Sequence, residues 1–132
     1  MARAHAKGRI LVIDDDELIS KMVGEMLHRI GYLSVACTKP ADALRLFSAA
    51  SERFDAVIMD EIMPGLRGTD LAPRILAIKE IPIILITGHG DMTSLERIRT
   101  SGVRATLIKP LQRDWLEHTL DNLLKKKNKE LY

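Results

Sequence analysis

The segment 9-RILVIDDDELI-19 joins a short apolar run directly to three carboxylates. Ile10 to Ile13 has the length and the continuous apolarity of a strand that is covered on both faces. Asp14, Asp15 and Asp16 follow at once, although like charges repel and are costly to desolvate beside a buried strand. This crowding predicts that a positive charge, such as a divalent cation, lies near the end of the strand.

Four further apolar runs follow along the chain, at Leu33–Cys37, Ala56–Met59, Ile83–Ile86 and Ala105–Ile108. Between and after them lie segments with apolar residues at helical spacing, at residues 18–30, 43–47, 71–78, 95–98 and 111–124. A strand followed by a helix, five times over, predicts a three-layer α/β sandwich with right-handed crossovers. We expect Pro73 to delay or distort the third helix, and the fourth to be short, with Leu95 and Ile98 as its anchors.

Polar residues stand where four of these strands end. The first strand is followed by Asp14, Asp15 and Asp16, the third ends in Asp60, the fourth in Thr87 and the fifth in Lys109. Ligands of open α/β sheets bind beyond the carboxyl ends of the strands. Carboxylates suit Mg²⁺, and a hydroxyl and an ammonium suit phosphate oxygens. Singly, Asp16 reads as a helix N-cap, Thr87 as a turn residue and Lys109 as a solvated side chain, but their coincidence favours a phosphate site.

Length and charge set further bounds. The 132 residues are 46% apolar and 29% charged, which is typical of one globular domain. The net charge is +2, and segment 125–132 contributes four Lys and one Glu, so the body is close to neutral and direct DNA binding is not expected.

Cys37 is the only cysteine, which fits a cytoplasmic location. No apolar run reaches the ~18 residues of a membrane span. We expect a disordered lead-in at residues 1–7, a domain at 8–126 and a basic tail at 127–132.

Four motifs carry a resemblance to a known family: ILVIDDDE, VIMDEIMPGLRG, ILITGHGD and LIKPL. Together they resemble the receiver domain of two-component response regulators, the phosphoacceptor family that includes the chemotaxis regulator. The resemblance covers about residues 8–126. It implies a flavodoxin-like fold, with a five-stranded parallel sheet of order 2-1-3-4-5 and five helices.

The resemblance also implies a role for each site residue. Asp60 would accept the phosphoryl group, and Mg²⁺ or Mn²⁺ would be held by Asp14, Asp15, Asp60 and the backbone carbonyl of Ile62. The other implied residues are Thr87 and Lys109 as phosphoryl-binding groups, Pro110 after a cis peptide bond, and Ile62 and His89 as residues that tune hydrolysis. The protein would be no enzyme beyond catalysing its own phosphorylation and dephosphorylation.

The implied partners are a sensor histidine kinase or a histidine phosphotransfer protein, and a target that docks on the fourth helix, fifth strand and fifth helix. The sequence departs from the family at three positions. Thr106 replaces the aromatic residue that often rotates on activation, Leu111 replaces a frequent Phe, and Gly88 replaces a small Ala. We therefore expect an output that needs no aromatic rotamer change.

Two alternatives remain open. A haloacid-dehalogenase-like phosphohydrolase also has Asp-x-Asp after its first strand, as in Asp14 and Asp16. However, Leu18 stands where that class has Thr, and no acidic pair follows a strand after Lys109. The second alternative is a receiver-like binding module that works without phosphorylation.

Overall fold

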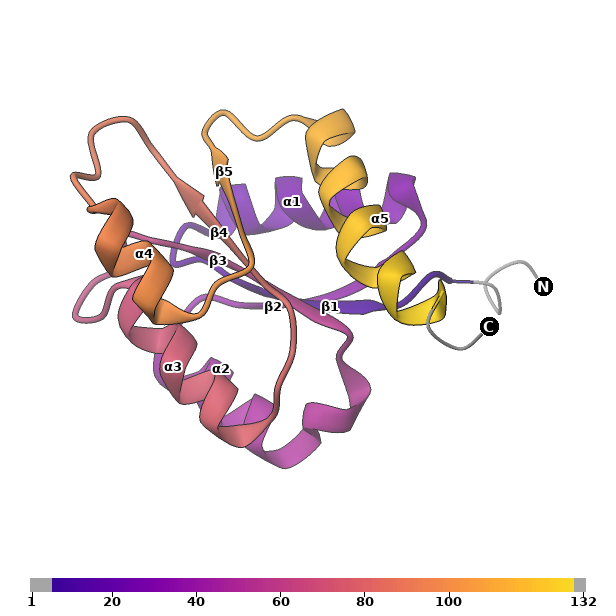
Figure 1. Ribbon diagram of the computed structural model, residues 1–132, viewed down its shortest axis with the longest axis horizontal. Coiled ribbons are helices and arrows are strands. Elements are labelled where there is room, and N and C mark those ends of the chain that lie inside the picture. The colour runs from indigo at the N-terminus through magenta and orange to yellow at the C-terminus, as the bar shows by residue number, and fades with distance from the viewer. Residues whose placement is uncertain (1–5, 130–132) are drawn as a thin grey trace.

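The computed structural model describes residues 6–129, with side chains for residues 6–124. Five strands form one parallel sheet in the order β2-β1-β3-β4-β5, which confirms the predicted fold class (Figure 1). The strands are β1 (Arg9–Ile13), β2 (Leu33–Cys37), β3 (Ala56–Asp60), β4 (Ile83–Thr87) and β5 (Ala105–Ile108). The helices are α1 (Glu17–Ile30), α2 (Pro40–Ala50), α3 (Gly68–Ile78), α4 (Leu95–Ser101) and α5 (Arg113–Lys129), with a 3₁₀ turn η2 (Ser51–Arg53).

Helices cover both faces of the sheet and form two apolar layers. In Figure 1, α1 and α5 lie on one face and α2 and α3 on the other. Alternate residues of β3 serve the two layers: Val57 and Met59 pack in the layer with α2 and α3, and Ala56 and Ile58 pack in the layer with α1 and α5. β1, β3 and β4 are therefore covered on both faces, as their continuous apolarity predicts.

The two edge strands do not follow that prediction. Leu33 and Val35 of β2 are 42% and 36% exposed, and Ile108 of β5 is 43% exposed. An edge strand has a neighbouring strand on one side only, and the helices above and below it cover it incompletely. Apolar composition alone does not separate such a strand from a central one.

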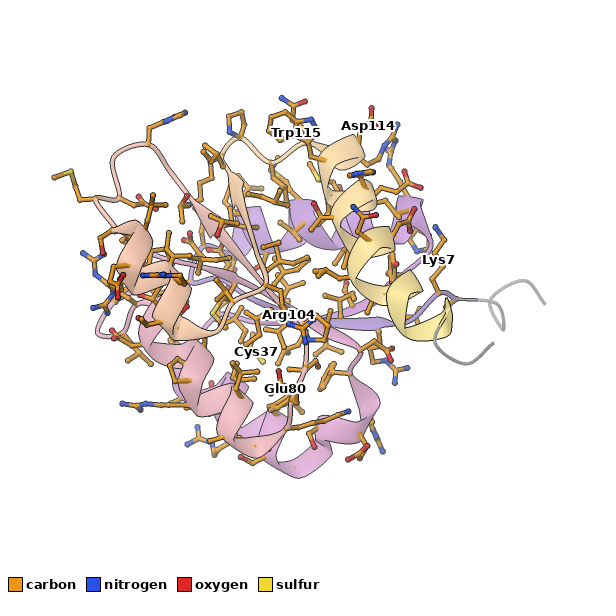
Figure 2. All side chains as sticks on the ribbon, in the orientation of Figure 1. Lys7, Cys37, Glu80, Arg104, Asp114 and Trp115 are labelled. Carbon is orange, nitrogen blue, oxygen red and sulfur yellow. The ribbon has the colours of Figure 1, made fainter. Side chains whose placement is uncertain are left out.

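Several apolar residues assigned to helix seams are also exposed. Leu18 and Met22 of α1 are 66% and 46% exposed, and Leu95 of α4 is 84% exposed. Trp115 lies at the start of α5 and is 57% exposed (Figure 2). These residues flank the seams, whose buried positions are taken by Val23, Leu27, Leu116 and Leu120 among others.

The third helix lacks the delayed start that was one of the two effects expected of Pro73. α3 begins at Gly68, five residues before Pro73, and contains Pro73 inside it. Its start is therefore not delayed. Pro73 has no N–H to donate to the carbonyl of Thr69, so the helix tolerates one missing bond in its second turn.

Contacts and helical structure are described on both sides of residues 8–126, the range expected for the domain. Lys7 donates its backbone N–H to Gly31, and its ammonium pairs with Glu117 and Asp121 of α5, as its position beside that helix in Figure 2 suggests. Residues 1–5 of the expected lead-in lie outside the described residues. At the other end, α5 continues to Lys129, and residues 130–132 of the expected tail lie outside the described residues. No helix among the described residues is long and apolar enough to cross a membrane.

Candidate phosphoryl and metal site

The sheet brings the acidic residues of the first and third strands together. Ile13 of β1 pairs with Met59 of β3, so Asp14 and Asp60 follow at adjacent strand ends. Both are buried, at 3% and 4% exposed, whereas Asp15 is exposed. Carboxylate oxygens of Asp14, Asp15 and Asp60 lie within 4.8 Å of one another. The structure therefore gathers three of the four predicted acidic residues into one cluster.

Asp16 stands apart from this cluster. Its carboxylate accepts hydrogen bonds from the backbone N–H groups of Leu18 and Ile19, so it caps α1. Local contacts also fix Asp14, which accepts the Asp16 N–H at 2.9 Å, while its carbonyl accepts the Ser20 hydroxyl at 3.1 Å. The first carboxylate is thus held rigidly at the end of β1.

The carboxylate cluster fits a hard divalent cation. Its ligand atoms are all carboxylate oxygens. Hard cations such as Mg²⁺ and Mn²⁺ prefer oxygen ligands, whereas softer metals prefer nitrogen or sulfur. Asp60 Oδ1 is buried and accepts no hydrogen bond from the described residues. Lys109 Nζ lies 3.0 Å from this oxygen and forms an ion pair with it. Asp60 therefore keeps lone pairs free for a further ligand.

Burial and crowding set the protonation of the cluster. Burial, reinforced by Asp60 and Asp15, raises the pKa of Asp14 to about 6. Burial also raises the pKa of Asp60, although Lys109 opposes the shift. For Lys109, burial alone would lower the pKa, but the carboxylates of Asp60, Asp14 and Asp91 outweigh it and the net shift is upward. The protein holds these carboxylates at a cost that a bound cation would reduce.

The fourth and fifth strands supply the remaining polar groups. Asp60 pairs with Ile86, so Thr87 lies one residue further along the edge. Thr87 pairs with Ile108 of β5, and its carbonyl accepts the Lys109 N–H at 2.8 Å. The peptide bond between Lys109 and Pro110 is cis. The hydroxyl and the ammonium therefore come from neighbouring strand ends.

Three other predicted positions lie around the site rather than in the cluster. Ile62 is 41% exposed and follows Asp60 by two residues. His89 is exposed in the loop between β4 and α4. Thr106 is exposed on β5, where it pairs with Leu85. Among the described residues, none of these three side chains forms a hydrogen bond or an ion pair with the Asp60 carboxylate.

Sequence reasoning missed two acidic residues beside the site. Glu61 is fully buried directly after Asp60, and its carboxylate accepts hydrogen bonds from α3 and from the loop before α4. Asp91 accepts the backbone N–H of Gly88 at 2.7 Å and so closes the loop that follows Thr87. In the sequence, the only indication that Glu61 matters is that a charged residue follows a buried strand. Asp60 at the preceding position already accounts for a charge there.

Comparison with known proteins agrees with this geometry. Residues 10–121 match the family model of the response regulator receiver domain. The chain is 31% identical to a probable transcriptional regulator, ycf27 of Guillardia theta, over 96% of this chain and 49% of that protein. The chain thus spans about half the length of that relative.

Solved structures give the same result. A response regulator receiver domain from Clostridium thermocellum superposes with a TM-score of 0.85 at 30% identity, covering 92% of this chain and 97% of the other. The receiver domain of sensor histidine kinase PA1611 from Pseudomonas aeruginosa has a TM-score of 0.78 at 26% identity, covering 89% and 98%. That receiver carries a magnesium ion coordinated in its active-site cleft.

Proposed function

The chain belongs to the response regulator receiver domain family of two-component systems, and we propose that Asp60 is the residue that accepts its phosphoryl group. The observation that carries the proposal is one arrangement. Three carboxylates lie within 4.8 Å, and the ammonium of Lys109 lies 3.0 Å from the carboxylate of Asp60. Family membership removes the phosphohydrolase alternative and leaves the non-phosphorylated binding module to be tested.

In the proposed reaction, an oxygen of the ionised Asp60 attacks the phosphorus of a phosphohistidine. An O–P bond forms, the N–P bond breaks, and its electron pair stays on the imidazole nitrogen. Lys109 neutralises charge on the phosphoryl oxygens, and the Thr87 hydroxyl donates a hydrogen bond to one of them. Bound Mg²⁺, held by Asp14, Asp15, Asp60 and the Ile62 carbonyl, would supply further charge neutralisation.

The second reaction is hydrolysis, in which water attacks phosphorus, the O–P bond to Asp60 breaks, the Asp60 carboxylate leaves and inorganic phosphate is released. Ile62 and His89, as residues at the edge of the site, would control the approach of that water. Apart from the phosphoryl group taken from the donor and the phosphate released by hydrolysis, these reactions change only the protein itself, so no turnover of a further substrate is proposed.

Receiver domains interact with sensor histidine kinases and with downstream effectors. For this chain we propose a histidine kinase or a histidine phosphotransfer protein as donor, and a target that docks on α4, β5 and α5. The β4–α4 loop and α4 would move on phosphorylation, because Thr87 begins this loop. Amide exchange with and without beryllofluoride, a phosphoryl mimic, should then change most at residues 87–100, whereas changes centred on α1 would contradict this surface.

Labelling tests the function directly. Wild-type protein incubated with acetyl phosphate and Mg²⁺ should gain one base-labile phosphoryl group by intact-mass spectrometry. Asp60→Asn should gain none, because an amide is not a competent nucleophile. Asp91→Asn, which removes a neighbouring carboxylate, is the matched control and should still label. Absence of label on the wild type would favour the binding module, and robust label on Asp60→Asn would refute the assignment.

A further inference from the structure

Glu61 is a fully buried carboxylate directly after the proposed phosphoacceptor. Its backbone N–H donates to the Ile86 carbonyl at 2.9 Å, and its own carbonyl accepts the Gly68 N–H at 2.9 Å. Its side chain accepts the N–H of Thr69 at 2.8 Å and the Thr69 hydroxyl at 3.0 Å. A buried charge needs such donors, since an unsatisfied one is strongly unfavourable.

A further hydrogen bond ties Glu61 to a distant segment. The Thr93 hydroxyl donates to Glu61 Oε2 at 2.7 Å, across 32 residues of sequence. Thr93 in turn accepts from Arg67 Nη1 at 3.1 Å, and Arg67 also lies 3.5 Å from the same carboxylate oxygen. Each hydroxyl donates once and accepts once, so the chain of bonds is chemically consistent.

α4 depends on this network because its apolar anchoring is weak. It has seven residues, its Leu95 is 84% exposed, and Ile98 is only partly buried against the core. Arg97 of α4 donates to the Thr69 hydroxyl at 2.7 Å and pairs with Asp70. Polar bonds to the start of α3 therefore hold α4, and those made through Thr69 and Thr93 lead to Glu61.

The segment between Thr87 and Thr93 is compact and strained. Gly88 and Asp91 close a small turn through two hydrogen bonds. Met92 has φ of 57°, a left-handed conformation that is unfavourable for a residue with a side chain. Surrounding contacts must hold a strained residue of this kind, and Thr93 is its immediate neighbour.

We propose that Glu61 is a positioning residue which, through Thr93, holds the β4–α4 segment in the conformation of the unphosphorylated domain. The segment begins at Thr87, whose hydroxyl is proposed above to bind a phosphoryl oxygen. This inference therefore rests on the proposed function. Movement of Thr87 toward a phosphoryl group pulls on a segment whose other end is fixed by the Thr93–Glu61 bond. The free energy needed to break that bond therefore opposes phosphoryl binding in the wild type.

The test is the affinity of the full chain for beryllofluoride in saturating Mg²⁺, measured by calorimetry. Thr93→Val removes the hydroxyl and keeps the shape, so it should tighten binding about three- to tenfold, the range expected when one ordinary hydrogen bond no longer favours the unbound state. Thr93→Ser keeps the hydroxyl and should bind as the wild type does. Thr100→Val is the matched control, because the Thr100 hydroxyl contacts only backbone carbonyls of α4.

A second measurement separates positioning from a general structural effect. Mg²⁺ affinity without beryllofluoride should be the same in all these variants, because Thr93 contacts no proposed metal ligand. If Thr93→Val does not fold, Arg67→Met is the second variant, because the Arg67 side chain is 41% exposed and donates to the Thr93 hydroxyl. It should weaken the Thr93–Glu61 bond and shift beryllofluoride affinity in the same direction.

Unchanged or weaker beryllofluoride binding in Thr93→Val would overturn the inference, as would a Thr93→Ser variant that behaves like Thr93→Val. Those outcomes can be told apart from failure of the proposed function, because if the proposed function is wrong, the wild type itself will not bind beryllofluoride.

Discussion

The ammonium of Lys109 lies 3.0 Å from Oδ1 of Asp60, at the ends of two strands that are separated by β4. Asp60 is buried, whereas the Lys109 side chain is 38% exposed. The pair therefore joins a buried carboxylate to a cation that reaches it from the solvent side. An incoming phosphoryl group would meet both charges at once.

This pairing predicts the effect of removing the cation. Lys109→Met should slow labelling by acetyl phosphate at least about tenfold, since preorganised charge at a transferring group has effects of this size or larger. Labelling time courses by intact mass measure the rate. Lys79→Met is the control, because Lys79 pairs with Glu52 and Ser51 away from the site. Labelling of Lys109→Met at the wild-type rate would contradict the role.

The raised pKa of Asp14, about 6, predicts a pH dependence of stability without metal. Between the ordinary pKa of 3.8 and about 6, the folded state holds a proton that the unfolded state has lost. Stability therefore rises as pH falls from 7.5 to 5, because the buried charge is neutralised. Asp14→Asn should be more stable than wild type at pH 7.5 by about 1–2 kcal/mol, since one pKa unit corresponds to about 1.4 kcal/mol.

Urea unfolding with a chelator at pH 5 and 7.5 checks this sign. The advantage of Asp14→Asn should shrink at pH 5, where Asp14 of the wild type is already largely protonated. Asp42→Asn, a change to an exposed carboxylate of α2, controls for net charge. An equal advantage at both pH values would show that desolvation of the charge is not the cause.

The sequence predicted the fold well because strands, helices and polar strand ends are all local patterns. Asp14 and Asp60 were assigned to one edge because parallel strands must end together. Leu18 and Leu95 were misassigned, since helical spacing indicates a face but not how much of it a neighbour covers. Glu61 was missed because its partners, Thr69 and Thr93, are distant in sequence and only the folded chain brings them together.

The carboxylate cluster predicts how Mg²⁺ affinity responds to mutation. Asp15→Ala should weaken Mg²⁺ binding at least about tenfold, or 1.4 kcal/mol, because it removes one of three carboxylates. Its stability without metal should be equal or higher, since like-charge repulsion is relieved. Calorimetry measures the affinity; Trp115 fluorescence is less suitable, because that side chain is exposed at the start of α5.

Asp16→Asn is the matched control for this experiment. It removes a charge from the next residue, and Asn is as good an N-cap as Asp. Its Mg²⁺ affinity should stay close to the wild-type value. If Asp15→Ala binds Mg²⁺ as tightly as the wild type, Asp15 is not a ligand.

The exposed side chain of Ile62 predicts the lifetime of the phosphoryl group. Ile62 is 41% exposed two residues after Asp60, where an apolar side chain disfavours an ordered water that would attack phosphorus. Ile62→Asn supplies hydrogen-bonding groups for that water and should speed dephosphorylation several-fold. Ile62→Leu is the control of similar volume and should decay as slowly as the wild type. Loss of label is followed by intact mass after the donor is removed, and equal decay of the Asn and Leu variants would show that polarity at this position does not control hydrolysis.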